Sequence, residues 1–393
     1  MDVDAFDQLL TADGQRLLAE LRDYDPAGEL ATATRLRRDH PAGLVSAALT
    51  QARLRQRAAA KFGPDAYRMY FTPDGVEQST RASVAAYRAA RFTALGPASV
   101  ADLCGGIGGD AIELARRGIR VTAVDRSPLT CAAARANAAA LELSELLTVE
   151  CADVLEFDTG GHEAVFVDPA RRAGRQRGGG RIFDPEAYSP PLSFAVGAAR
   201  SARWAAIKVA PGIPHEAVPE DAEAEWISDG GDVKEAVLWF GTEPGVRRAT
   251  LLPAGVSLTG RGLPDPPVRP VGRYLYEPDG AVIRAHLVAE VAEEVGGGLL
   301  DPTIAYVTAD DAVPTPFATA YEITDVLPFH LKRLKALLRD REVGVVTVKK
   351  RGSAVEPEEL RRKLKLAGPH SCTVFLTRVA GAPSMLLGHP VRA

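Results

Sequence analysis

Glycines and carboxylates in the first half of the chain have the types and spacing that bind a nucleotide-like cofactor. The glycines lie in segment 102–110, which reads Asp-Leu-Cys-Gly-Gly-Ile-Gly-Gly-Asp. An apolar strand is predicted over 98–103, and apolar residues at helical spacing follow the glycines until Gly118. Glycine permits a positive φ and lets a ligand approach closely, and a helix start supplies unpaired N–H donors. The segment therefore predicts a cofactor-binding turn between a strand and a helix.

Three further carboxylates stand at the ends of successive predicted strands. They are Asp125, Asp153 and Asp168, the last followed by Pro169. The strands are predicted over 119–124, 146–151 and 164–167, with a helix over 130–141. A carboxylate at the end of the second strand is placed to bind ribose hydroxyls. An NAD enzyme is the main alternative, but the glycine turn lacks the Gly-x-Gly-x-x-Gly spacing of that class.

This series resembles the class I S-adenosylmethionine-dependent methyltransferases over residues 80–241. The resemblance implies a Rossmann-like α/β fold with a seven-stranded sheet, in which the glycine turn holds the methionine end of S-adenosylmethionine. It also implies an acid at ribose after the second strand and an acid beside adenine after the third. The implied cofactor-binding residues are Asp102, Cys104, Gly105, Gly106, Gly108, Asp125, Arg126, Asp153 and Val154. Glu77 and Thr80, upstream of the first strand, are expected to line the same site, although Thr80 also fits an ordinary helix cap.

The end of the fourth strand holds the candidate catalytic residues, Asp168 and Pro169. Methyl transfer is an in-line displacement, so the enzyme mainly aligns the acceptor. The Asp168 carboxylate and the Pro169 carbonyl could accept hydrogen bonds from an amino group and orient its lone pair. This resembles the Asp/Asn-Pro-Pro-aromatic motif of amino-directed nucleic-acid methyltransferases, with Ala170 and Arg171 in place of the second proline and the aromatic residue.

Arginines follow this motif and point to an anionic substrate. The loop contains Arg171, Arg172, Arg175, Arg177 and Arg181 around three glycines. Guanidinium groups favour phosphate and carboxylate partners, and a merely solvated loop is the alternative. Lys208 lies in the fifth predicted strand, 204–209, and either faces the substrate or neutralises Asp168. Strands predicted over 223–227 and 235–240 form the antiparallel end of the sheet, which the resemblance implies for class I enzymes.

Composition is that of a globular enzyme. The chain has 393 residues, 46% of them hydrophobic and 25% charged, with a net charge of −4 that gives no global argument for nucleic acid. The four cysteines lack paired spacing and the histidines lack metal-ligand spacing, so neither a disulfide framework nor a metal site is predicted. No apolar run reaches the length of a membrane span, and we expect a cytoplasmic protein.

The pattern predicts three domains: a helical one over 1–80, the methyltransferase domain over 81–241 and a small α/β domain over 242–393. In the third, a linker is predicted at 263–267. Helices are predicted over 281–295, 328–339 and 357–366, with strands over 343–349 and 372–379. This arrangement, with the phrase Val-Val-Thr-Val-Lys-Lys-Arg-Gly at 345–352, resembles the THUMP-like domain of some bacterial methyltransferases. THUMP domains are RNA-binding modules, so the resemblance implies an RNA partner.

Positive charge is concentrated within this third domain. Residues 332–365 contain twelve Lys or Arg and five acids, a net charge of +7. Such a segment is a candidate phosphate-binding face, although solvated helices carry similar charges. Lys349, Lys350 and Arg351 are the candidate contacts, because they gather charge at a strand end.

The resulting hypothesis is a methyltransferase that acts on a base nitrogen of tRNA or rRNA. Two alternatives stay open. One is a methyltransferase for an anionic small molecule or a protein; the other is a non-catalytic RNA-binding scaffold. RNA binding weakens steeply with salt, and S-adenosylmethionine binding separates the enzymes from the scaffold.

Overall fold

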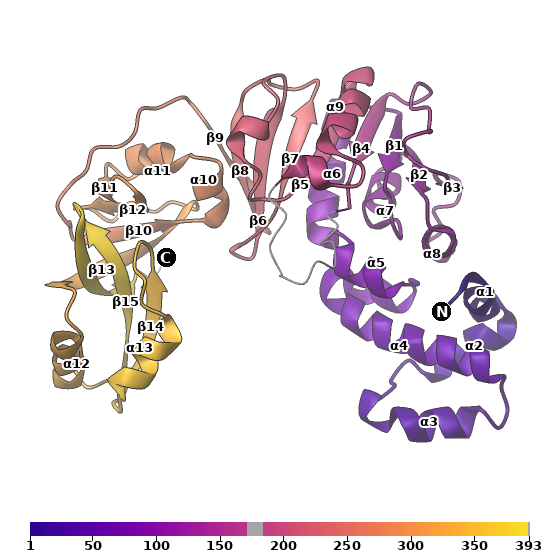
Figure 1. The fold of residues 1–393 in the computed structure, drawn as a ribbon, viewed down its shortest axis with the longest axis horizontal. Helices are drawn as coiled ribbons and strands as arrows, with labels where there is room; N and C mark the ends of the chain where they lie inside the picture. The colour runs from indigo at the N-terminus through magenta and orange to yellow at the C-terminus, as the bar shows by residue number, and fades with distance from the viewer. Residues whose placement is uncertain (171–183, 392–393) are drawn as a thin grey trace. The chain divides into compact units, whose positions relative to one another are not determined.

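The computed structural model describes residues 1–170 and 184–391, which form two compact units (Figure 1). The first unit comprises residues 1–223 and 235–245. The second comprises residues 224–234 and 246–393. The arginine loop predicted after Pro169, with Arg171 and Arg172, lies outside the described residues.

Helices make up the N-terminal part of the first unit, as the apolar spacing predicts. They are α1 (Val3–Leu10), α2 (Ala12–Glu20), α3 (Glu29–Leu36), α4 (Ala42–Phe62), α5 (Pro73–Gln78) and α6 (Ala82–Leu95). Asp2 and Thr11 cap the first two helices with side-chain oxygens. The buried Gln51 of α4 donates to the Phe71 carbonyl at 2.6 Å and accepts from the Phe71 amide at 3.0 Å. This pair of hydrogen bonds fixes the chain just before α5.

A mainly parallel sheet forms the centre of the first unit. Its strands are β1 (Ser99–Leu103), β2 (Arg120–Asp125), β3 (Leu147–Cys151), β4 (Ala164–Val167), β5 (Trp204–Val209) and β7 (Asp232–Phe240), in the order β3-β2-β1-β4-β5-β7. Strand β7 runs antiparallel to β5, with Ala205 opposite Phe240. The reversed final strand expected of a class I methyltransferase is therefore present, and every residue of β4 is buried between covering layers.

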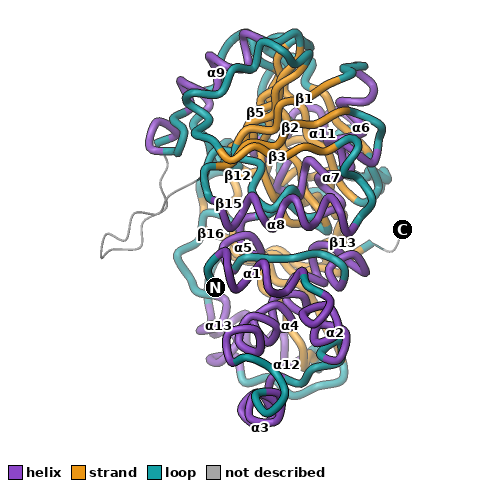
Figure 2. The backbone as a smooth tube through the Cα atoms, turned by 90° about the vertical axis from the view of Figure 1, so that its right-hand side faces the viewer, coloured by secondary structure: helices purple, strands orange, loops and turns teal. Residues whose placement is uncertain are grey.

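Helices α7 (Gly109–Arg116), α8 (Pro128–Ala140) and α9 (Leu192–Ser201) connect the parallel strands. Figure 2 shows α8 between the strands and the N-terminal helix α1. The buried Asn137 of α8 accepts from the Tyr70 amide at 2.6 Å and donates to the Ile107 carbonyl at 2.9 Å. One side chain thus joins the N-terminal helical region to the glycine turn.

The second unit contains two groups of strands. Strand β8 (Arg247–Leu252) pairs with β6 (Glu223–Asp229) in parallel and with β9 (Val256–Thr259) in antiparallel orientation. The other strands form a sheet in the order β11-β12-β10-β13-β16-β15-β14. They are β10 (Tyr274–Pro278), β11 (Gly298–Asp301), β12 (Ile304–Ala309), β13 (Ala318–Pro328), β14 (Val343–Lys350), β15 (His370–Val379) and β16 (Ala382–Pro390). The sequence predictions covered β14 and β15 but missed β8–β13 and β16.

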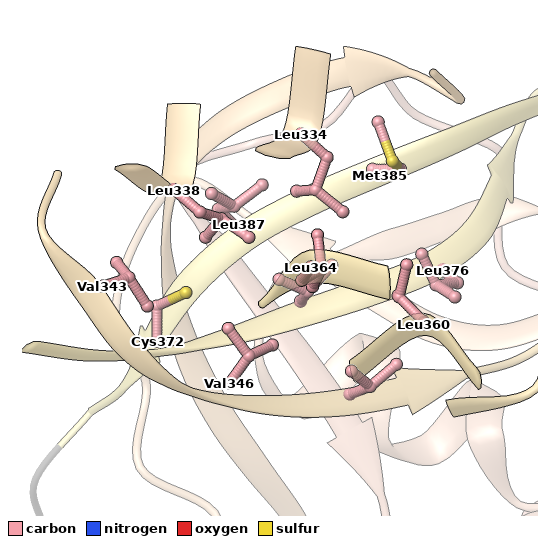
Figure 3. Close-up of a cluster of buried hydrophobic side chains, with 12 residues drawn as sticks. Leu334, Leu338, Val343, Val346, Leu360, Leu364, Cys372, Leu376, Met385 and Leu387 are labelled. Carbon is pink, nitrogen blue, oxygen red and sulfur yellow. The ribbon is translucent and has the colours of Figure 1, made fainter. Parts of the chain in front are cut away.

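Helices α12 (Leu331–Asp340) and α13 (Pro357–Leu364) pack on β14, β15 and β16. Leu334 and Leu338 of α12 meet Leu360 and Leu364 of α13 in a buried cluster with Met385 of β16 (Figure 3). Burying these side chains removes both helices' apolar faces from water. The polar faces of the two helices are therefore the exposed ones.

Two predicted helices of this unit need correction. The stretch 281–295 forms two short helices, α10 (Gly280–Arg284) and α11 (Val288–Glu294), because His286 between them adopts a left-handed φ of 59°. The helix predicted from residue 328 begins at Leu331. Residue 328 still belongs to β13, and the His330 side chain caps the helix by accepting from the Arg333 amide at 3.3 Å.

Candidate functional site

The glycine turn after β1 has the backbone shape that its sequence predicts. Cys104, Gly106 and Gly108 have positive φ values of 64°, 57° and 88°. A Cβ on Gly105 would lie 3.1 Å from the Ala123 Cβ and 3.1 Å from Asp102 Oδ2, whereas a Cβ on Gly106 would meet nothing within 4 Å. Gly105 is therefore packed against the protein, and the Gly106 side of the turn is open.

Asp125 joins this turn to the end of β2. Its Oδ2 accepts from the Gly106 amide at 3.2 Å and its Oδ1 accepts from the Ser127 amide at 2.9 Å. A carboxylate has about four acceptor positions, so Asp125 retains capacity for two hydroxyl donors. The side chain is partly exposed and Arg126 beside it is exposed.

Asp153 follows β3, the neighbour of β2. Cys151 pairs in register with Asp125, which places Asp153 and Asp125 at adjacent strand ends. Asp153 is exposed, and among the described residues its carboxylate accepts only the Leu155 amide, at 3.0 Å. Val154, the residue after Asp153, is buried. The two acids and the open turn thus follow three neighbouring strands, β3, β2 and β1.

Asp102 is also close to the turn but is fully buried. Neither of its carboxyl oxygens has a hydrogen-bond partner among the described residues. Burial, followed by the nearby Asp110 and Asp168, raises the pKa of Asp102 well above its usual value. The carboxyl lies on the packed Gly105 side of the turn, and its predicted contact with a cofactor stays a prediction.

Asp168 is held by a lysine from the neighbouring strand. The Lys208 ammonium donates to Asp168 Oδ2 at 2.7 Å and to the Thr80 hydroxyl at 2.9 Å. Burial lowers the pKa of Lys208, but the carboxylates of Asp168, Glu235 and Asp110 outweigh it and raise that pKa above its usual value. Lys208 therefore carries a charge that neutralises Asp168, which is one of the two roles open from the sequence.

A buried arginine network that the sequence analysis missed lies behind these residues. Arg88 of α6 forms ion pairs with Asp110 of α7 and Glu235 of β7, and its guanidinium lies 4.5 Å from the Phe166 ring centroid. The Arg88 side chain is 1% exposed. No motif signals this network, because its residues are far apart in the sequence. The two arginines of the mainly apolar helix α6, Arg88 and Arg91, are the only local hint.

A known methyltransferase is similar in sequence to most of this chain. The chain is 36% identical over 343 residues to an uncharacterized S-adenosylmethionine-dependent methyltransferase of Mycobacterium tuberculosis strain H37Rv, and the match covers 84% of this chain and 92% of the relative. The chain belongs to the S-adenosylmethionine-dependent methyltransferases. The same identity and coverage apply to the protein of strain CDC 1551.

Models of three families match parts of this methyltransferase. They are described as RNA cap guanine-N2 methyltransferase at 98–192, THUMP domain-like at 318–390 and a domain of unknown function at 2–58. The fold is similar to the crystal structure of a Porphyromonas gingivalis W83 protein assigned as a methyltransferase, with a TM-score of 0.76 and 23% identity. That match covers 94% of this chain and all of the other.

The residues present fit S-adenosylmethionine, the cofactor of this family. The open side of Gly106 leaves room for a ligand where a Cβ would otherwise stand, and Asp125 offers acceptors for a ribose diol beside it. Glu77 is exposed and paired with Arg57 at 3.2 Å, and Thr80 is buried against Lys208. Cofactor contacts of Glu77 and Thr80 stay predictions.

Asp125→Ala is expected to weaken S-adenosylmethionine binding by about 10- to 100-fold, because a hydrogen bond to a charged group contributes about 1.5–3 kcal/mol. Titration calorimetry with the full-length protein measures the Kd. Asp158→Ala is the control, because Asp158 is an exposed aspartate whose side chain likewise accepts a nearby backbone amide, that of Gly160 at 2.9 Å. An unchanged Kd for Asp125→Ala would remove this residue from the cofactor site.

The predicted phosphate contacts of the second unit are engaged in ion pairs. Lys349 pairs with Glu277, and Arg351 lies 3.8 Å from the same carboxylate. Lys350 pairs with Glu356 at 2.5 Å. These three cations are therefore partly neutralised by the protein itself, and their binding of a substrate stays a prediction.

A cavity of about 440 Å³ in the second unit is lined by residues that the sequence analysis did not select. The polar lining includes Arg341, His370 and His389. Among the described residues, no cluster of His, Cys, Asp or Glu could hold a metal ion. The described helices include none that is long and apolar enough to cross a membrane.

Proposed function

We propose that this methyltransferase methylates an amino nitrogen of a base in tRNA or rRNA. The position of the Asp168 carboxylate beside the glycine turn carries the proposal. The family descriptions support RNA as the substrate, since one names an RNA cap guanine-N2 methyltransferase and another a THUMP-like domain.

Asp168 is positioned by the strand before it. Strand β4 pairs with β1, and the Asp168 amide donates to the Leu103 carbonyl at 3.1 Å, so the carboxylate follows the same sheet edge as the turn. The Lys208 ammonium donates to Asp168 Oδ2, while Asp168 Oδ1 accepts no hydrogen bond from the described residues. The side chain is 26% exposed. An amino N–H of a base can therefore donate to Asp168 Oδ1.

This arrangement favours transfer to nitrogen through alignment. S-adenosylmethionine, when bound, supplies the electrophilic methyl group. Asp168 accepts the amino N–H and turns the nitrogen lone pair away from the carboxylate, while the buried Pro169 next to it restricts the backbone after the strand. The ion pair with Lys208 sets the orientation of the Asp168 carboxylate before the substrate binds. The side chain therefore loses less conformational entropy when it aligns the amino group.

Mass spectrometry of tRNA and rRNA nucleosides from a strain that lacks the gene tests the proposal. One methylated nucleoside should be missing, and the wild-type gene should restore it. Asp168→Ala should not restore it, whereas Asp158→Ala should. An unchanged nucleoside profile would contradict the proposal and favour a small-molecule or protein substrate.

A further inference from the structure

Helices α12 and α13 of the second unit expose a strongly basic surface. Their leucines are buried in the cluster of Figure 3. Lys332, Lys335 and Arg339 occur at i, i+3 and i+7 in α12, which places them on one side of that helix over about 10 Å of its length. Lys332 and Arg339 are exposed, and Lys335 is half-buried.

One hydrogen bond joins this side of α12 to the end of α13. The Lys335 ammonium donates to the Lys363 carbonyl oxygen at 3.1 Å. Arg362 and Lys365, both exposed, flank Lys363 in the sequence. The five residues Lys332, Lys335, Arg339, Arg362 and Lys365 form what is called here the basic stripe.

Among the described residues, the five stripe cations and Arg333 form no ion pair, whereas the other six cations of segment 332–365 each have an acidic partner. Lys350, Arg361 and Lys363 pair with Glu356, Glu358 and Glu359, and Arg341 pairs with Asp325. In the part of the chain that the structure describes, none of the five stripe cations forms an ion pair within 4.0 Å. The charge of the stripe is therefore available to a partner outside the unit.

Such an arrangement suits a polyanion with a regular backbone. Like charges one turn apart on a helix repel each other, and phosphates placed between them relieve that repulsion while releasing counterions. The stripe consists of side chains that project from two helices, so it can follow successive phosphates without a pocket that selects a base.

We infer that the basic stripe binds the phosphate backbone of the RNA substrate. The inference rests on the proposed function for the identity of the polyanion. It places the phosphate contacts on α12 and α13, whereas the sequence alone pointed to the strand end at Lys349, Lys350 and Arg351. Those three are held by Glu277 and Glu356.

The test compares binding of total tRNA by three full-length proteins across a range of salt concentrations. The stripe variant carries Lys332→Ala, Arg339→Ala and Arg362→Ala. The control carries Arg261→Ala, Arg273→Ala and Lys363→Ala, three exposed cations of the same unit that already have acidic partners. Both variants lose three positive charges, so a difference between them reports position rather than net charge.

We expect the stripe variant to flatten the slope of log K against log[salt] by about 2, because each phosphate contact contributes about 0.7–0.9 to that slope. The control should retain the wild-type slope. Equal slopes for the stripe variant and the wild type, or an equal loss in the control, would overturn the inference. Thermal melting of each variant verifies that it is folded.

This outcome is separable from that of the proposed function, since binding is measured without methylation. A flattened slope in a protein that alters no nucleoside would support the stripe and contradict the proposed function. A missing nucleoside together with an unaltered slope in the stripe variant would support the proposed function and contradict the stripe inference. No binding of total tRNA by the wild type would overturn the inference, while the nucleoside profile would still decide the proposed function.

Discussion

Asp168→Ala is expected to lower kcat for methyl transfer by about 100- to 1,000-fold, the usual loss when one preorganised hydrogen-bonding group is removed from a reacting centre. The substitution removes the acceptor for the substrate amino group and leaves the Lys208 ammonium buried without its partner. Single-turnover transfer from S-adenosylmethionine to RNA measures the rate. The Kd of S-adenosylmethionine, measured separately, should change much less.

A second variant separates catalysis from stability. Removing one partner of a buried ion pair costs about 3–5 kcal/mol when both are fully buried, and the 26% exposure of Asp168 makes the cost smaller here. Asp168→Ala with Lys208→Met should recover the free energy of unfolding without recovering kcat. If the double variant regained wild-type activity, Asp168 would only be a partner for Lys208.

Arg88→Met is expected to lower the free energy of unfolding by about 3–5 kcal/mol, because two buried carboxylates lose their shared cation. Asp110 and Glu235 are both nearly inaccessible to solvent and lie on α7 and β7. Urea unfolding at neutral pH measures the change. Arg16→Met is the matched control, since the Arg16–Asp13 pair is exposed and such pairs contribute about 0–1 kcal/mol.

The loss caused by Arg88→Met should depend on pH. Burial, the largest influence, already raises the pKa of Glu235 above its usual value, while Arg88 opposes that rise. Without Arg88, Glu235 in the folded protein binds its proton more tightly than it does in the unfolded chain. The free energy of unfolding therefore increases as the pH falls toward the pKa of Glu235 in the unfolded chain. The variant should therefore lose less stability at about pH 5 than at about pH 8. A loss independent of pH would point to lost packing on Phe166 instead.

The sequence predicted the parts of this protein that depend on neighbours along the chain. Glycines with a required left-handed φ, apolar runs and the acids that follow them located β1 to β5, the turn at 102–108 and the strand ends at Asp125, Asp153 and Asp168. Backbone conformation is largely a local preference, so it can be inferred from a short window. The same reasoning failed at His286, where one left-handed residue divides an apolar stretch into two helices.

Only the tertiary structure decided which charges are available and which are neutralised. Arg88 meets a carboxylate 147 positions away, Lys208 meets Thr80 128 positions away, and Lys349 meets Glu277 72 positions away. Residue type and spacing pointed to Lys349, at a strand end, rather than to Lys332 as the candidate contact for a phosphate. The fold distinguishes them, because an ion pair depends on which side chains lie within about 4 Å in space, and that distance is set by the packing of strands and helices far apart in the chain.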